Sequence, residues 1–207
     1  MDAEALRALA EELSALHGCH AVVLYGSRAR GTHRPDSDVD LLLVRRSGAG
    51  TRDVRLWRGV QVDAFVDEEA KLDPEKDEGL LRIRHGVLLR DETGFGASLV
   101  RRTQEVFARG PAALPPEEVE ALRVWGGKML QRIASGGVGA DYRRVSLLTE
   151  LLPLHFKLRR RWYLGSEEAL RSLEEEEPEA HEAFARALEP GAAPEAIEAL
   201  VKRVLGG

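Results

Sequence analysis

The sequence predicts an α+β fold: an N-terminal domain with a mixed β-sheet and flanking helices, followed by an all-α helical bundle domain. Strand-like and helix-like patterns alternate in residues 1–110, whereas apolar residues beyond them recur at helical spacing. Between these parts, GPAALPP at residues 110–116 carries the glycine and prolines that interrupt regular structure. We therefore expect one domain over residues 1–110 and a second over residues 111–207.

The first domain is expected to start with an amphipathic helix over residues 3–17, because leucines at helical spacing are followed by Gly18. HAVVLY and DVDLLLV predict two buried strands around a tight turn containing GSRARG. Two more strands are expected within TRDVRLWRGVQVDAFVD, joined near Arg58 and Gly59. The remaining expected elements are a helix over 74–84, a strand at HGVLLR, a turn at DETG and a helix over 95–109.

The second domain is expected to contain five helices. Pro153 should kink the second of them, because proline removes a backbone donor and crowds the preceding turn. The expected ranges are 117–134, 140–163, 166–176, 178–188 and 194–204.

Composition narrows the class of protein. The net charge is −5 with mixed signs, so the chain lacks the basic excess of a general nucleic-acid-binding protein. The single Cys19 excludes an intramolecular disulfide framework and a zinc site made of several cysteines, and it favours a reducing compartment. No apolar run approaches the length of a membrane span. We expect a cytoplasmic protein.

Three aspartates form the pattern that points to chemistry. Asp38 and Asp40 are two apart on an expected strand, so their carboxylates project from the same face and repel each other unless a cation bridges them. Asp63, in the alternating strand VQVDAFV, completes a three-carboxylate cluster if its strand lies beside theirs. Hard oxygen ligands suit Mg²⁺, which also binds substrate phosphates. The pattern therefore indicates a metal–nucleotide complex as ligand.

The preceding turn supplies groups that suit phosphate. Gly26 and Gly31 let backbone amides approach an anion, and Ser27 is expected to add a hydroxyl and to cap a short helix. The candidate phosphate-binding arginines are Arg28, Arg30 and Arg34. Taken alone, GSRARG fits a polar turn and DSDVD a solvated strand entry. Their combination with Asp63 favours a nucleotide site.

The series Gly26-Ser27, Gly31, Asp38-x-Asp40 and the later Asp63 resembles the nucleotidyltransferase superfamily that includes DNA polymerase β. The form GSRARGTHRPDSDVDL is most similar to the bacterial antibiotic nucleotidyltransferases and the minimal nucleotidyltransferases. More loosely, residues 111–207 resemble the helical acceptor-binding domain of the aminoglycoside and lincosamide enzymes.

This resemblance implies transfer of a nucleoside monophosphate from a nucleoside triphosphate, with ATP as the expected donor and pyrophosphate as the product. By the same resemblance, Asp38 and Asp40 would hold the metals that bridge the phosphates, with two Mg²⁺ ions expected. Asp63 would bind the metal on the acceptor side and help to deprotonate the attacking hydroxyl. Ser27 and the Gly26 backbone would bind the outer phosphates.

The acceptor side is less defined by sequence. On the expected helix over 140–163, one stripe is apolar, and the other places Glu150 as candidate general base and Lys157 as candidate phosphate ligand. The apolar stripe is Val145, Leu148, Leu152, Phe156 and Tyr163, and the polar stripe adds Arg143 and Arg161. A solvated helix face is the competing interpretation. Asp91 and Glu92 are rival bases, and Trp125, Trp162 and Tyr163 are expected in the helical core.

The sequence is compatible with several functions. The first hypothesis is modification of a small hydroxyl-bearing molecule, drug-like or metabolic. The second is modification of a protein, as in minimal nucleotidyltransferases acting as antitoxins, and the third is a non-catalytic nucleotide sensor. RNA tailing is disfavoured, since the acidic balance offers no continuous basic track. The sequence does not choose between ATP and GTP, nor does it establish whether a second copy in a homodimer completes the site.

Overall fold

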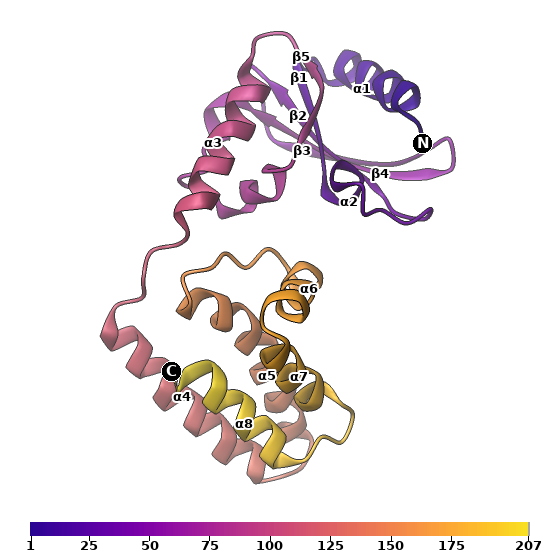
Figure 1. The fold of residues 1–207 in the computed structure, drawn as a ribbon. Helices are drawn as coiled ribbons and strands as arrows, with labels where there is room; N and C mark the ends of the chain where they lie inside the picture. The colour runs from indigo at the N-terminus through magenta and orange to yellow at the C-terminus, as the bar shows by residue number, and fades with distance from the viewer. Residues whose placement is uncertain (207) are drawn as a thin grey trace. The chain divides into compact units, whose positions relative to one another are not determined.

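The structure is a computed structural model that describes residues 1–206. It divides into two compact units, Met1–Arg109 and a second that begins at Gly110. The first unit contains a sheet with helices, and the second is helical (Figure 1). The α+β fold class is confirmed.

A mixed sheet of five strands forms the centre of the first unit, in the order β3-β4-β2-β1-β5. Strands β2 and β4 run parallel, whereas the other neighbouring pairs are antiparallel. The strands are β1 (Ala21–Tyr25), β2 (Val39–Arg45), β3 (Thr51–Trp57), β4 (Val60–Glu68) and β5 (Val87–Asp91). The helices are α1 (Ala3–His17), α2 (Gly26–Arg30), α3 (Phe95–Arg109) and the short 3-10 helices η1 (Glu69–Lys71) and η2 (Glu78–Ile83).

The central strands β1 and β2 are buried on both faces, and their successive side chains point alternately to the two sides of the sheet. One face packs against α1, where Leu9 and Leu13 meet Leu41 and Ala64. The other face packs against η2 and α3, and its cluster includes Val23, Leu42, Leu80, Ile83 and Leu99. Asp40 and Asp63 alternate with residues of the α1 face and therefore belong to the η2 face.

One local prediction for this unit was wrong. The expected helix over 74–84 is instead the 3-10 helix η2, in which Leu80 and Ile83 eclipse at a spacing of three and enter the same core cluster. The Asp77 side chain accepts a hydrogen bond from the Gly79 amide and fixes the start of η2. GSRARG forms α2, the short helix expected within the turn.

The second unit consists of five helices: α4 (Pro116–Ala134), α5 (Val138–Leu158), α6 (Ser166–Glu176), α7 (Pro178–Leu188) and α8 (Pro194–Leu205). Prolines open α4, α7 and α8, where a missing N–H costs no helical hydrogen bond. Their shared core includes Leu151, Leu173, Phe184 and Leu200. No helix among residues 1–206 has the length and apolarity needed to cross a membrane.

Helix α5 ends earlier than the sequence pattern predicts. It continues through Pro153 but stops at Leu158, and Arg160 adopts a left-handed backbone with φ of 57°. Tyr163 therefore lies outside the helix and is 38% exposed, with its ring beside Phe156. The expectation of a core position holds better for Trp125, which packs against the core cluster.

Candidate active site

Two of the three predicted carboxylates lie side by side. Asp40 in β2 is directly opposite Asp63 in the parallel strand β4. Asp38 immediately precedes β2 and is exposed. The condition set by the sequence pattern, that the Asp63 strand neighbours the Asp40 strand, is therefore met.

The start of α2 lies against this carboxylate pair. Tyr25, the last residue of β1, is opposite Asp40 in the antiparallel register, and Gly26 follows it with φ of +73°. A Cβ atom on Gly26 would lie only 2.2 Å from Oδ2 of Asp40. Glycine is needed here both for the left-handed backbone and for the close approach of the carboxylate.

Ser27 does not cap α2 as expected. The cap position is occupied by Tyr25, and no side-chain capping hydrogen bond forms. The Ser27 carbonyl instead accepts the amide of Thr32, which closes the loop after α2. Because Ser27 is the second residue of α2, its hydroxyl lies two positions beyond the cap residue of that helix.

Arg28 is engaged by the protein backbone. Its Nε donates to the carbonyl oxygens of Ser37 at 3.1 Å and Asp38 at 2.9 Å, and Nη2 also donates to Ser37. The guanidinium thus ties α2 to the residues that lead into β2. In this arrangement Arg28 positions Asp38 rather than presenting its fork to a phosphate, while the predicted Arg34 is exposed in the intervening loop.

The two paired aspartates have opposite electrostatic environments. Burial raises the pKa of Asp40, and the neighbouring Asp63 and Asp38 carboxylates raise it further, against a lowering effect of Arg82 and Arg30. Arg52 lowers the pKa of Asp63, because its Nε and Nη2 donate to the two carboxylate oxygens at 2.7 and 2.6 Å. Asp40 therefore carries negative charge that the surrounding protein compensates only in part.

The three aspartates have the chemistry of a divalent-metal site. Asp38, Asp40 and Asp63 offer hard oxygen ligands, and the mutual repulsion at Asp40 is the feature that a divalent cation would relieve. Residues 1–206 contain no preformed group of three metal-ligating side chains. Asp63 is held by Arg52, and Asp38 accepts from Gln61 Nε2 at 3.3 Å. The donor chemistry fits Mg²⁺, and binding of the metal by Asp63 requires its carboxylate to release Arg52.

Arg52 and Arg82 are site residues that the sequence pattern did not single out. Arg52 was detectable in principle, because it shares a face of β3 with Val54, which pairs with Asp63, and itself pairs with Phe65, two residues after Asp63. Arg82 comes from η2, and only the packing of η2 over the sheet brings it near the carboxylates. No local sequence motif predicts that Arg82 lies near the carboxylates.

The predicted acceptor-side residues lie in the second unit. Glu150 is exposed on α5, and within residues 1–206 its carboxylate forms no hydrogen bond or ion pair. Lys157 is exposed as well and lies 3.6 Å from a carboxylate oxygen of Glu118. The proposed polar stripe is wrong at Arg161, which lies beyond α5 and pairs with Glu176 and Glu177.

The apolar stripe predicted for the same helix is only partly correct. Leu148, Leu152 and Phe156 are buried, whereas Val145 is 59% exposed. Arg143 is confined to α5 itself, where its Nη1 donates to the carbonyl oxygen of Gly139. The exposed face of α5 therefore remains compatible with a solvated helix surface.

The rival bases Asp91 and Glu92 lie at the opposite end of the sheet. Asp91 pairs in register with Ala21, whereas Asp40 pairs with Tyr25, and four residues of strand separate these positions by about 13 Å. The Asp91 carboxylate accepts the amides of Gly96 and Ala97 and so caps α3. These contacts remove Asp91 as a base beside Asp63.

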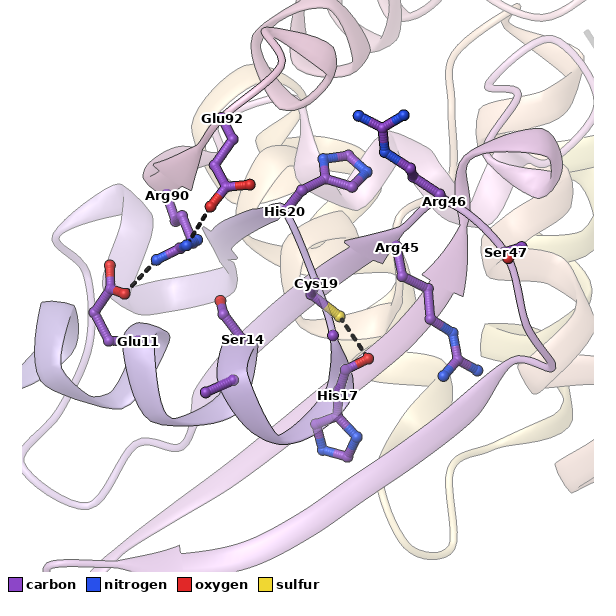
Figure 2. A pocket seen from close by; sticks show the side chains of 12 residues that line it. Glu11, Ser14, His17, Cys19, His20, Arg45, Arg46, Ser47, Arg90 and Glu92 are labelled. Atoms are coloured by element: carbon purple, nitrogen blue, oxygen red, sulfur yellow. Dashed lines mark hydrogen bonds and ion pairs between the residues drawn. The ribbon is translucent and has the colours of Figure 1, made fainter.

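Glu92 lines an open hollow of about 620 Å³ at that far end, shown in Figure 2. There Arg90 pairs with both Glu11 and Glu92. The other lining residues include Ser14, His17, Cys19, His20, Arg45 and Arg46. Glu92 is therefore committed to an ion pair away from the aspartate pair.

Comparison with known proteins identifies the class to which this geometry belongs. Residues 6–89 match the model of the nucleotidyltransferase domain family, and this range contains the paired aspartates and the Gly26 turn. The chain is a transferase, and the matched part is a nucleotidyltransferase domain that fits the DNA polymerase β-like superfamily. The resemblance to the nucleotidyltransferase superfamily that the motif indicates is confirmed.

One of the solved structures that match the chain is the nucleotidyltransferase-like protein from Exiguobacterium sibiricum 255-15. It is 14% identical, with a TM-score of 0.46, and the alignment covers 99% of this chain and 74% of that protein. No curated protein gives a significant match to the chain.

Proposed function

We propose that this protein transfers a nucleoside monophosphate from a nucleoside triphosphate, with ATP as donor, to a hydroxyl group of a small molecule and releases pyrophosphate. The observation that carries the proposal is the register of Asp40 against Asp63, with Gly26 pressed against the Asp40 carboxylate. A nucleotidyl-transfer site needs paired carboxylates beside a backbone that admits phosphates.

Asp38, Asp40 and Asp63 are the residues that would hold Mg²⁺. When bound, the metal would neutralise charge on the attacking and leaving oxygens of an in-line displacement. Asp40 is suited to this role because its neighbours leave its negative charge only partly compensated.

The remaining chemistry falls to groups of the chain. The acceptor hydroxyl oxygen forms a bond to the α-phosphorus, and the bond from that phosphorus to the bridging oxygen of pyrophosphate breaks. The hydroxyl proton passes to a carboxylate, either Asp63 or Glu150. The Gly26–Ser27 backbone and Arg30, which is close enough to affect the pKa of Asp40, would bind phosphate oxygens.

The helical unit is proposed to bind the acceptor. Support comes from the loose resemblance of residues 111–207 to acceptor-binding domains and from the exposed carboxylate of Glu150, which is uncommitted within residues 1–206. Glu150 would act as base and Lys157 would bind phosphate. A fused helical unit also favours a small-molecule acceptor over a protein acceptor, because antitoxin-like enzymes are often little more than the catalytic domain.

The test is a label-partition assay with Mg²⁺, α-phosphate-labelled ATP and a cell extract. Wild type is compared with Asp40→Asn and with the matched control Asp36→Asn, which changes an exposed aspartate of the same loop. We expect wild type and Asp36→Asn to move label into a new small-molecule species, and Asp40→Asn to lose this transfer while staying folded.

Other outcomes count against parts of the proposal. Label in protein instead of small molecules would replace the acceptor class with a protein. Near-normal transfer by Asp40→Asn would overturn the assignment of the site. If no fraction gains label with any of the four common nucleoside triphosphates, magnesium-dependent nucleotide binding without transfer would identify a sensor.

A further inference from the structure

Arg82 lies over the middle of the sheet in an unusual setting. Its guanidinium carbon is 4.5 Å from the ring centroid of Phe65 and 5.1 Å from that of Tyr25. Tyr25 belongs to β1 and Phe65 to β4, the two strands that flank β2. Arg82 therefore spans β2 from above, held by an aromatic ring on each side.

The same position is next to the aspartate pair. Tyr25 is opposite Asp40 in register, and Phe65 follows Asp63 by two residues, so all four side chains share one face of the sheet. The Arg82 charge acts on both carboxylates and lowers the pKa of each. It is the cation that both aspartates share.

The contacts of Arg82 differ from those of the neighbouring arginines. Arg28 donates to the carbonyl oxygens of Ser37 and Asp38, and Arg52 donates to both oxygens of Asp63. Within residues 1–206 the Arg82 guanidinium forms cation–π contacts but no hydrogen bond or ion pair. Its N–H donors are thus available while its position is fixed by the rings.

We propose that Arg82 binds the polyphosphate of the donor nucleotide, an inference that rests on the proposed function. A guanidinium presents a planar fork of N–H donors that matches phosphate oxygens. Aromatic rings can hold its position while the N–H edge donates to an anion. Arg82 also supplies positive charge where the aspartates would otherwise repel the triphosphate. It thereby takes the phosphate-binding part that the sequence pattern gave to Arg28.

The experiment measures two affinities by titration calorimetry without acceptor: inorganic tripolyphosphate in the presence of Mg²⁺, and Mn²⁺ alone. The variants are Arg82→Gln and Arg82→Lys. The matched control is Arg58→Gln. Arg58 also lies over an aromatic ring, 4.3 Å from the centroid of Trp57, but Trp57 belongs to the core cluster on the α1 face of the sheet, away from the aspartates.

We expect Arg82→Gln to weaken tripolyphosphate binding by about tenfold or more, as for loss of a charge-assisted hydrogen bond. The same variant should bind Mn²⁺ as tightly as wild type or more tightly, because a cation near Asp40 and Asp63 is removed. The tripolyphosphate affinity of Arg82→Lys should lie between those of wild type and Arg82→Gln, because lysine keeps the charge but lacks the planar fork of N–H donors. Arg58→Gln should stay within about twofold of wild type for both ligands, a spread below 1 kcal/mol.

A loss of tripolyphosphate affinity while Mn²⁺ affinity is kept or raised separates ligand binding by Arg82 from damage to the fold, which would weaken both affinities. Tripolyphosphate affinity of Arg82→Gln within twofold of wild type would overturn the role of Arg82 and leave the proposed function standing. Wild type that binds neither tripolyphosphate nor any nucleoside triphosphate would overturn both.

Discussion

Gly26 and Asp40 are in a contact that no other residue at position 26 would allow. A Cβ atom built on Gly26 would meet Oδ2 of Asp40 at 2.2 Å, and the backbone φ of +73° is itself unfavourable for side-chain-bearing residues. The glycine of the turn and the aspartate of the next strand are thus one structural unit. The spacing between Gly26 and Asp40 in the motif therefore reflects their packing as well as their chemistry.

Gly26→Ala is expected to weaken metal and nucleotide binding strongly. The added methyl group must push the Asp40 carboxylate aside, in addition to a backbone penalty of about 1–2 kcal/mol. Gly31→Ala is the matched control: it has φ of +72° but nothing within 4 Å of the new Cβ. Both variants should lose thermal stability from backbone strain, Gly26→Ala more than Gly31→Ala because of the added clash, and only Gly26→Ala should lose Mn²⁺ affinity in calorimetry. Equal Mn²⁺ affinities would contradict the contact.

Arg52→Ala should let metal bind more readily. Arg52 occupies both oxygens of Asp63, so a metal ion competes with it for this ligand. The gain in Mn²⁺ affinity is expected to be only a few-fold, because the Arg52 side chain is 57% exposed and such ion pairs are weak. Arg55→Ala is the control, since Arg55 pairs with Asp53 on the opposite face of β3. A weaker Mn²⁺ affinity in Arg52→Ala would show that the arginine supports metal binding.

The second unit is expected to lose stability on mild acidification through His155. This side chain is fully buried, and burial, followed by the charge of Arg159, lowers its pKa, against the opposing effect of Glu177. In the unfolded chain the histidine binds a proton at its ordinary pKa of about 6.5, whereas the folded protein resists it. The free energy of unfolding should therefore fall as pH drops from that value toward the lowered pKa, and stay level above it.

Urea unfolding at a series of pH values tests this expectation, with His155→Gln as the comparison. The variant should be less stable at neutral pH, because the ring packs against Phe156 and Phe184, but it should lack the part of the pH slope due to the histidine. Identical slopes in both proteins would assign the acid sensitivity to other groups.

Adjacent glycines of α4 should respond in opposite directions to alanine. A Cβ on Gly126 would lie 2.5 Å from Cδ1 of Leu205 and 3.2 Å from Cγ1 of Val201, both on α8, so Gly126→Ala should destabilise the unit by about 1–3 kcal/mol. Gly127 has nothing within 4 Å, and Gly127→Ala should stabilise it by about 1 kcal/mol through helix propensity. Denaturant unfolding measures both, and a loss of stability in Gly127→Ala would contradict the open position.

Most elements and the aspartate pair follow from local patterns in the sequence. The boundaries of α1, α3, α6 and α7 match the apolar spacing. The alternation in VQVDAFV set Asp63 apart from its apolar neighbours, and the parallel pairing then put it beside Asp40. Periodicity is sufficient for such cases because it reports which face of an element is buried.

Prediction fails where one side chain has two chemically reasonable partners. Arg28 was assigned to phosphate, but the loop carbonyls of Ser37 and Asp38 hold it. Asp91 has the chemistry of a base, yet it caps α3. The early end of α5 likewise removes Arg161 from the stripe on which helical spacing had placed it. These outcomes depend on distances between segments far apart in the chain.

The sequence by itself determined the class of fold, the nucleotidyltransferase motif and the carboxylates, because short-range spacing encodes backbone conformation and the faces of strands. Only the tertiary structure decided that Arg52 holds Asp63 and that Asp91 lies far from the aspartate pair. It also decided that Arg82 lies over Tyr25 and Phe65 with no hydrogen bond or ion pair within residues 1–206. The physical reason is that long charged side chains are placed by the packing of distant elements, and η2 brings Arg82 to the sheet through Leu80 and Ile83.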